Sequence, residues 1–471
     1  MRQDLVSPRD MVGSGLCIGC GACALNDANV PVRLEWDADG QLKPRGPAEW
    51  YCSPSESFSW VCPFSPLAPD EDEIAREAFP AAALSDPWIG RCDAAYVGHV
   101  AEPGYRERGS SGGMVSWVAA ELLKRGMVDG VAHVAACYSH QVQNRLFAYR
   151  ISRTVDELHE GAKSRYYPIE MSAVLSEMRE RPGRYAMVGI PCFIKATRLL
   201  CKQDAVIRDR ISFTLGLVCG HMKSRQMVES FAWQMGSTIG DVEGIDFRVK
   251  NPDRPANWYR AQIMCRDGTS RSQDWWHLVD GDWGSGFFQN RACDFCDDVV
   301  AETADISFGD AWLEPYSSDG RGTNVVIVRS PSLHALIREG VRDGRLSLSP
   351  VDAAFVRETQ AAAFRQRREG LAYRLSWRCF GVRPRKRVDR SSFSPTLRRK
   401  LIYRCRHHIS RWSSRFFRLG KWLNRPALFI GWGRAILYIY QALTYSRGRA
   451  GRLADWAEAK IPLSRERPER R

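Results

Sequence analysis

Several widespread sequence signatures are absent from this chain of 471 residues, and each absence excludes a class of protein. No G-x-x-x-x-G-K-S/T run occurs and no G-x-G-x-x-G follows a predicted strand, so the chain has neither a P-loop nor a dinucleotide-binding Rossmann fingerprint. The nine histidines are scattered, and no Ser/His/Asp arrangement or carboxylate pair stands out. The first ten residues are polar with no apolar segment after them, so we expect no secretory signal and a chain that starts in the cytoplasm.

Acidic residues are scarce in the last part of the chain. Residues 384–471 hold 23 Lys or Arg and 5 Asp or Glu, whereas the preceding 383 residues hold 45 and 49, so a near-neutral body carries a basic tail. The net charge of +14 therefore gives no general argument for nucleic-acid binding, and we expect no nucleic-acid partner. With 44% hydrophobic residues, the composition is that of a globular protein large enough for two or three domains.

Strand-like and helix-like patterns alternate from about residue 94 onwards. Apolar runs predict strands at 94–100, 130–137, 184–189, 211–219, 304–309 and 323–329. Helical patterns lie between them or follow them, at 114–125, 192–200, 224–235 and 331–338. This alternation predicts an α/β body.

Cysteine is abundant, and fifteen cysteines without an export signal indicate metal ligation or redox chemistry rather than disulfides. Three form a C-x2-C-x2-C run and a fourth precedes a proline after an irregular stretch: Cys17, Cys20, Cys23 and Cys62. This is the ligand spacing of ferredoxin-type [4Fe–4S] binding, because thiolates three residues apart in a tight loop can face three iron corners. Gly19 and Gly21 allow the backbone to approach the sulfides. Zinc is the alternative metal, and Cys52 is the alternative fourth ligand.

A second C-x2-C pair, Cys293 and Cys296, is ambiguous by itself, since such pairs also serve zinc or a thiol–disulfide couple. Cys192 and Cys219 each end a predicted strand, and the carboxyl ends of parallel strands converge at one edge of a sheet. These four can close a second [4Fe–4S] site, or Cys192 and Cys219 are small core residues. We interpret the remaining seven as structural: Cys52, Cys92, Cys137, Cys201, Cys265, Cys379 and Cys405.

Seven short motifs occur in one order, at 17–23, 110–113, 163–166, 189–192, 219–220, 293–296 and 304–310. Together they resemble the coenzyme F420 hydrogenase/dehydrogenase beta-subunit family, over roughly residues 13–328. The resemblance implies a flavin and iron–sulfur oxidoreductase, with FAD in the α/β body and [4Fe–4S] clusters that pass it single electrons. It also favours a second cluster on Cys192, Cys219, Cys293 and Cys296. Implied redox partners are ferredoxin, coenzyme F420, or a hydrogenase or dehydrogenase subunit.

The resemblance also points to flavin contacts. Serines and glycines open the helix at 114–125, where N–H groups and hydroxyls suit a flavin pyrophosphate, or form an ordinary N-cap. Lys163 and Arg165 can hold phosphate or the charge of a reduced flavin, or be solvated surface. The expected cofactor-binding residues are Ser110, Ser111, Gly112, Gly113, Lys163, Ser164, Arg165, Tyr166, Gly189, Pro191, Gly309 and Asp310. The candidate catalytic residues are Lys163, Asp310 and His221, of which His221 has a structural role as its alternative.

The tail has two helical patterns. Apolar residues step by three or four from Leu397 to Leu423 with arginines on the other faces, which predicts a basic amphipathic helix. Residues 426–445 are long enough to span a bilayer, but Arg434 near their centre costs about 2.5–3.5 kcal/mol on insertion scales. We therefore favour attachment of residues 396–445 to an anionic membrane surface over a span. The alternatives are docking onto a partner or the body, and nucleic-acid contact.

These patterns predict an α/β body with an N-terminal ferredoxin-like [4Fe–4S] module and a C-terminal helical tail. The expected boundaries are 1–90, 91–383 and 384–471. The predicted function is an iron–sulfur flavoprotein oxidoreductase that passes electrons between two clusters and FAD, in the cytoplasm and peripherally on the inner face of the membrane. One alternative is a non-catalytic electron-relay protein in surface polysaccharide production, and a weaker one is a zinc-stabilised binding module.

Overall fold

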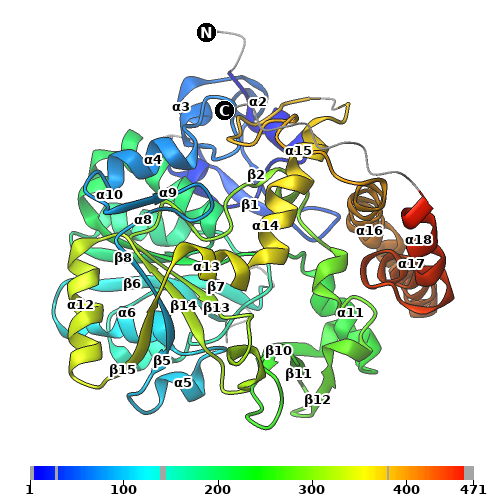
Figure 1. Cartoon of the computed structure of the whole chain (residues 1–471). Coiled ribbons are helices and arrows are strands. Elements are labelled where there is room, and N and C mark those ends of the chain that lie inside the picture. The colour runs from blue at the N-terminus through cyan, green and yellow to red at the C-terminus, as the bar shows by residue number, and fades with distance from the viewer. Residues whose placement is uncertain (1–4, 27–29, 138–144, 379–380, 461–471) are drawn as a thin grey trace.

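One large mixed sheet forms the centre of the computed structural model, which describes residues 5–26, 30–137, 145–378 and 381–460 (Figure 1). The strand order is β15-β5-β14-β13-β9-β8-β6-β7. Four central strands are parallel: β13 (Ile306–Asp310), β9 (Ile211–Leu217), β8 (Tyr185–Gly189) and β6 (Gly130–Ala136). The outer strands are antiparallel to their neighbours: β14 (Asn324–Val328), β5 (Ala94–Val100), β15 (Leu346–Val351) and β7 (Phe147–Ser152). The predicted α/β body is confirmed.

Helices cover both faces of this sheet, so its strands are apolar on both sides. Within β14, Val326 and Val328 join one hydrophobic cluster, while Val325 and Ile327 join another. The first cluster contains α6 (Met114–Lys124) and α12 (Pro331–Arg342), with α5 (Tyr105–Arg108) and α7 (Val155–His159) beside it. The opposite face carries α8 (Ser172–Glu180), α9 (Pro191–Gln203), α10 (Ala205–Arg210), α13 (Ala353–Thr359) and α14 (Ala361–Arg367).

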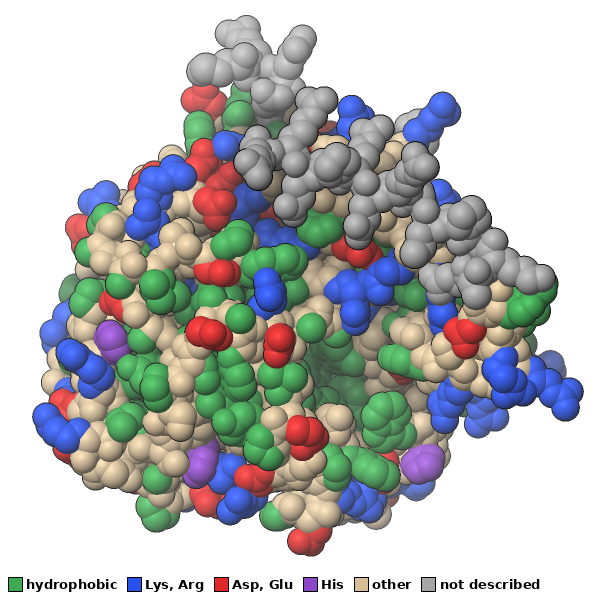
Figure 2. All heavy atoms as spheres, viewed as in Figure 1, with side chains coloured by type: hydrophobic (Ala, Val, Ile, Leu, Met, Phe, Trp, Pro, Cys, Tyr) green, Lys and Arg blue, Asp and Glu red, His purple; other side chains and the backbone are tan. Residues whose placement is uncertain are grey.

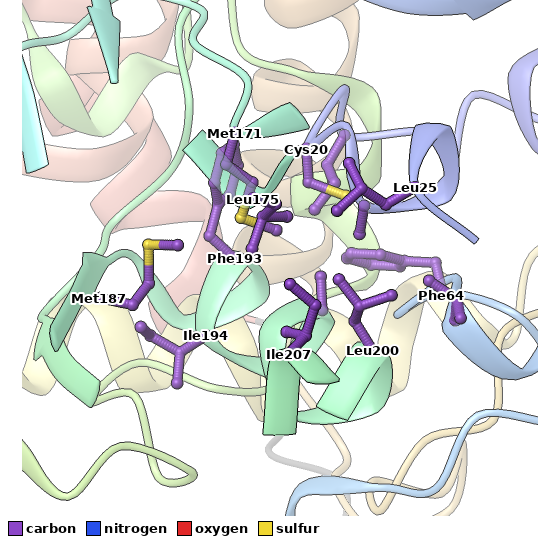
Figure 3. Packing of buried hydrophobic residues seen from close by; sticks show 14 of the residues in the cluster. Cys20, Leu25, Phe64, Met171, Leu175, Met187, Phe193, Ile194, Leu200 and Ile207 are labelled. Carbon is purple, nitrogen blue, oxygen red and sulfur yellow. The ribbon is translucent and has the colours of Figure 1, made fainter. Parts of the chain in front are cut away.

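The N-terminal segment is made of short elements. It contains α1 (Pro8–Gly13), η2 (Ala22–Ala24), β1 (Arg33–Trp36), β2 (Leu42–Arg45), α2 (Ala48–Cys52), α3 (Glu56–Val61), α4 (Glu71–Ala78), β3 (Leu84–Asp86) and β4 (Gly90–Cys92). Its apolar side chains share a core with the body: Cys20, Leu25 and Phe64 pack in one cluster with Phe193 and Leu200 of α9 (Figure 3). The segment therefore lies directly on the face of the sheet that α9 covers.

A second layer lies beside the large sheet. The three-stranded antiparallel sheet β10 (Val242–Val249), β11 (Arg260–Cys265) and β12 (Ser270–Asp274) packs with α11 (Gln226–Gln234) in one hydrophobic cluster. Short 3-10 turns connect the remaining parts: η3 (Ile239–Asp241), η4 (Trp275–His277), η5 (Trp283–Ser285), η6 (Arg291–Phe295) and η7 (Tyr316–Ser318). The sequence analysis did not predict this small sheet, because β12 is largely polar and exposed.

Three helices follow α15 (Glu369–Leu375): α16 (Leu397–Trp422), α17 (Pro426–Tyr445) and α18 (Gly448–Lys460). The two predicted tail helices are confirmed, since Thr396 caps α16 and Pro426 starts α17. Ile409, Phe417 and Phe429 are buried in the same cluster as β10, β11 and α11. The tail therefore docks on the protein's own body, which was one of the expected alternatives. Among the described residues, no helix is long and apolar enough to cross a bilayer.

Candidate functional site

The first cysteine set consists of Cys17, Cys20, Cys23 and Cys62. Its loop leads from α1 to η2, and Gly19 and Gly21 take the left-handed φ values of +71° and +84°. A Cβ at Gly19 would lie 2.3 Å from the carbonyl oxygen of Leu42, and one at Gly21 would lie 2.7 Å from Glu170 Oε2. Glycine at both positions therefore lets the loop pack against β2 and the start of α8.

Cys62 lies with this loop, and Cys52 does not. Burial raises the pKa of Cys23 well above its ordinary value, and the neighbouring thiols of Cys20, Cys17 and Cys62 raise it further. Burial likewise raises the pKa of Cys20 to about 12. Cys52 ends α2 and is exposed. The four thiols that the ferredoxin-type spacing predicts as ligands therefore lie together.

The second cysteine set, Cys192, Cys219, Cys293 and Cys296, comes from three separate parts of the chain. Cys192 lies in the first turn of α9 after β8, Cys219 follows β9, and the other two lie in and directly after η6. All four line one small cavity. The N–H of Met222 donates to Cys293 Sγ at 3.3 Å. Tertiary folding thus joins the two strand-end cysteines to the C-x2-C pair.

The two cysteine sets are neighbours. Ile18 of the first loop and Phe64, two residues after Cys62, both line the cavity of the second set. Burial raises the pKa of Cys192 well above its ordinary value, and Cys20 of the first set is among the thiols that raise it further. Within the described ranges, no three His, Cys, Asp or Glu side chains are arranged to hold a single metal ion. The thiols of the second set instead line one cavity together with Asp298 and Arg367.

The guanidinium group of Arg367 lies at the second cysteine set. Arg367, at the end of α14, lines the cavity and donates to the carbonyl oxygens of Gly220 at 2.6 Å and Cys293 at 3.0 Å. Burial acts to lower the pKa of Arg367, but the four thiols raise it above its ordinary value. The second set therefore contains a positive charge supplied by the C-terminal part of the chain.

His221 lies on the other side of this set. Its ring stacks on Trp283, with 4.3 Å between centroids, and its Nδ1 is 3.3 Å from a guanidinium nitrogen of Arg406. Burial, Lys223 and Arg406 lower the pKa of His221 well below its ordinary value, so the ring is neutral at pH 7. Burial also lowers the pKa of Lys223 to about 7.

A group of cations lies at the carboxyl end of β13, beside β10. We refer to this group as the cationic recess and define it by Lys163, Arg248, Lys250 and Asp310. Arg248 pairs with Asp310 at 3.0 Å, and Lys163 pairs with Asp246 at 3.1 Å. The Arg248 guanidinium lies 4.3 Å from the centroid of the Tyr259 ring.

The pKa of Lys250 indicates an excess of positive charge in the cationic recess. Burial and the neighbouring cations Lys163, Arg106 and Arg248 lower the pKa of Lys250 to about 8. Its Nζ donates to the carbonyl oxygen of Ser111 at 2.9 Å. Cations that depress one another's protonation are stabilised when an anion binds among them.

The predicted loop at 110–113 borders the recess, but its polar groups are largely used. The Ser110 hydroxyl accepts from the N–H of Ser164 at 2.9 Å, and the Ser111 hydroxyl donates to a carbonyl oxygen at 3.1 Å. The N–H of Met114 at the start of α6 donates to Asn324 Oδ1 at 3.2 Å, and Gly112 and Gly113 pack closely against neighbouring backbone. These contacts fix the loop beside Lys163 and Lys250, whose ammonium groups carry the positive charge there.

Tyr166 faces an aromatic group beside the recess. Its ring lies 4.8 Å from Trp283, 5.7 Å from Trp275 and 5.4 Å from Phe247, measured between centroids. Burial raises the pKa of Tyr166. These rings give the recess an apolar wall.

The structure separates the other predicted flavin contacts. Gly309 directly precedes Asp310, the last residue of β13, and a Cβ at Gly309 would lie 2.6 Å from Val218. Arg165 stacks on Phe147 at 4.9 Å. Gly189 ends β8 and Pro191 lines the cavity of the second cysteine set. Thus Lys163, Ser164, Tyr166 and Asp310 lie together, and Pro191 lies at the second cysteine set. His221 stacks on Trp283, whose ring also contacts Tyr166.

Sequence reasoning missed three cations of the site, Arg248, Lys250 and Arg367. The available signal was the spacing of Arg248 in β10 and Lys250 directly after it, since residues two apart in extended backbone face the same side. Arg367 gave no signal, because it lies 71 residues after Cys296 and meets it only through tertiary packing.

Comparisons with known proteins agree with these features. Residues 95–176 match the model of the coenzyme F420 hydrogenase/dehydrogenase beta subunit N-terminus, and residues 183–354 match that of its C-terminus. The coenzyme F420 hydrogenase subunit beta of Methanococcus voltae is 24% identical over 259 residues, which are 52% of this chain and 80% of that protein. The F420-dependent formate dehydrogenase 1 subunit beta of Methanococcus maripaludis is 23% identical over 214 residues, covering 45% of this chain and 51% of that protein.

A solved structure is also similar. A chain of the F420-reducing [NiFe] hydrogenase complex from Methanosarcina barkeri matches with a TM-score of 0.47 and 16% identity, over 62% of this chain and 95% of that one. The two family models together cover more than half of the sequence, from the first strand of the large sheet to the start of α13. The chain therefore belongs to the coenzyme F420 hydrogenase/dehydrogenase beta-subunit family, whose members are oxidoreductase subunits.

Proposed function

We propose that this chain is the electron-transferring subunit of an oxidoreductase complex, with a [4Fe–4S] cluster at each cysteine set and FAD in the cationic recess. The N-terminal segment acts as its ferredoxin-like module. The observation that carries the proposal is the adjacency of the two cysteine sets, with Ile18 and Phe64 between them. Two thiolate-held clusters so close would form a continuous route for single electrons.

The donor chemistry fits iron–sulfur clusters. Each set offers four thiols and no histidine, and thiolates are the usual ligands of [4Fe–4S] clusters. A structural zinc site needs four ligands about 2.0–2.3 Å from one ion, whereas a cluster spreads its thiolates over several irons. Thiols spread around a cavity favour the cluster, and the Met222 N–H that donates to Cys293 Sγ would stabilise a thiolate there.

The cationic recess fits a flavin with an anionic pyrophosphate. Lys163 and Lys250 would bind phosphate oxygens, which relieves their mutual repulsion. Arg248 is fixed by Asp310 and by the Tyr259 ring, so its guanidinium points in a set direction. Tyr166, Trp275 and Trp283 would exclude water from one side. When bound, FAD exchanges two electrons with a substrate and single electrons with clusters.

The test is anaerobic purification followed by assays of iron, sulfide, zinc and flavin, with an absorption spectrum. We expect about eight irons, about eight sulfides and one flavin per chain, because each [4Fe–4S] site holds four irons. Clusters without flavin would support the electron-relay alternative. Zinc without iron or flavin would contradict the proposal and support a binding module.

The partner of this subunit is part of the same proposal. The relatives from the two Methanococcus species are beta subunits of a hydrogenase and a formate dehydrogenase, so we propose a further subunit as the electron partner of this chain. Coenzyme F420 is the two-electron carrier named for those relatives, and ferredoxin is the one-electron alternative. Reduction of F420 by the purified complex, followed by its absorbance, separates the two carriers.

We also propose that the outer face of the tail attaches to an anionic membrane surface. Large apolar side chains remain exposed on α16 and α17, among them Trp412, Trp422 and Tyr438. The neighbouring Arg411 and Arg415 are exposed as well, and Figure 2 shows Lys and Arg side chains over the tail helices at the right of the view. Exposed aromatic and basic side chains on one helical layer suit the interface of an anionic bilayer.

Flotation with vesicles of phosphatidylglycerol and phosphatidylcholine tests this attachment. The double substitution Arg411→Glu and Arg415→Glu should weaken binding at least about tenfold, since each basic residue near an anionic surface contributes about 1 kcal/mol. The matched control is Arg338→Glu with Arg342→Glu on α12, where both arginines are also exposed. Equal flotation of all three proteins, or flotation insensitive to salt, would contradict the attachment.

A further inference from the structure

The segment that follows the family match packs against the second cysteine set. The match ends at residue 354, but side chains beyond it hold the loop that carries Cys293 and Cys296. Arg374 donates to the carbonyl oxygen of Asp294 at 2.7 Å, and His407 Nδ1 lies 2.9 Å from its carboxylate. Lys386 pairs with Asp297 at 3.0 Å. This loop is therefore positioned by residues of α15, of α16 and of the segment that connects them.

Most of the cations that contact this loop from beyond residue 354 form ion pairs with carboxylates. The positive charges of Lys386 and Arg374 are offset by Asp297 and Asp294, with which they form ion pairs. A paired cation contributes little net field at a distance, because its partner opposes it.

Arg367 differs from them. It is 3% exposed, and its hydrogen bonds in the described part of the chain all go to carbonyl oxygens, those of Gly220, Cys293 and Cys296. The described residues include no carboxylate in an ion pair with it. Its guanidinium lines the same cavity as the four thiols and Asp298, with which it forms no ion pair in the described part of the chain. A full positive charge therefore lies in a low-dielectric region against the second set.

We propose that Arg367 is a positioning residue that raises the reduction potential of the cluster at the second cysteine set. This inference rests on the proposed function. A reduced cluster carries one more negative charge than an oxidised one, so a nearby unpaired cation stabilises the reduced form. The step is a one-electron transfer between clusters, in which one is oxidised and the other reduced and no proton is required.

The experiment is an anaerobic redox titration followed by electron paramagnetic resonance, on the full chain with both clusters. Arg367→Gln removes the charge but keeps an N–H donor for the carbonyl oxygens. We expect it to lower one midpoint potential and leave the other unchanged, so that the sharing of an electron between the clusters changes at least about tenfold, which is about 59 mV for one electron. Arg367→Lys, which keeps the charge, should remain close to the unsubstituted protein.

The matched control is Arg365→Gln, because Arg365 is exposed on the same helix α14. Equal midpoints in Arg367→Gln, Arg365→Gln and the unsubstituted protein would overturn the inference. If the Arg367→Gln protein loses iron, the Arg367→Lys protein provides the test. An iron content and a midpoint potential close to those of the unsubstituted protein would support the role of the charge. Loss of iron from both variants would overturn the inference. Unsubstituted protein without clusters would instead remove the proposed function itself.

Discussion

Replacing Cys62 with serine is expected to remove about half of the iron from the anaerobically purified protein, or about four irons per chain. Cys62 ends α3 and its thiol acts on the pKa of Cys23, so it completes the first cysteine set. Serine lacks the soft thiolate that iron prefers, and three remaining thiols hold a cluster less tightly. The spectrum of the second cluster should persist.

The matched control is Cys52→Ser. Cys52 is exposed at the end of α2, and we expect its substitution to leave iron, sulfide and the spectrum unchanged. The pair decides between the two fourth ligands that the sequence left open. Loss of iron in Cys52→Ser but not in Cys62→Ser would assign the ligand to Cys52 and contradict the arrangement described above.

Replacing Arg387 with methionine is expected to lower the free energy of unfolding by about 3–5 kcal/mol, the usual cost of removing one partner of a buried ion pair. The Arg387 side chain is 8% exposed and pairs with Glu302 at 2.7 Å, while Asp297 lies 3.6 Å away. Glu71 of α4 is within 3.8 Å. Arg387 thus joins the C-terminal segment, the body and the N-terminal segment, and its loss leaves buried carboxylates under-compensated.

Arg385→Met is the control for this substitution. The Arg385 side chain is 50% exposed and pairs with Glu73 at 2.7 Å on the surface. Exposed pairs contribute about 0–1 kcal/mol, so we expect little change. Urea unfolding of both variants, monitored by tryptophan fluorescence and by circular dichroism, gives the comparison. Equal stability of the two variants would show that the buried network does not hold the segments together.

The sequence by itself determined the features that depend on local spacing. The cysteine run at 17–23, the strands at 94–100 and 211–217, and the helices at 397–422 and 426–445 all follow from periodicity, caps and prolines within a few residues. The C-x2-C-x2-C run predicts a cluster loop for the same reason, because such a loop needs its thiolates and glycines close in sequence. The pair Cys293 and Cys296 was ambiguous by itself.

Tertiary structure decided which distant groups meet. Sequence position alone left Cys52 and Cys62 as rival ligands, and the packing of α3 brings Cys62 to the loop while α2 leaves Cys52 exposed. The strands β7 and β15 and the small sheet β10–β12 were missed as well. β15 pairs with β5, far away in sequence, and β12 is largely polar.

The same distinction applies to the charges at the site. Arg248 and Lys250 reach the recess because β10 packs beside β13, and Arg367 reaches the second cysteine set because α14 folds back on the loop at 293–296. In sequence these are ordinary basic residues. Their burial against thiols and aromatic rings, which only long-range packing creates, is what gives their charges a strong effect.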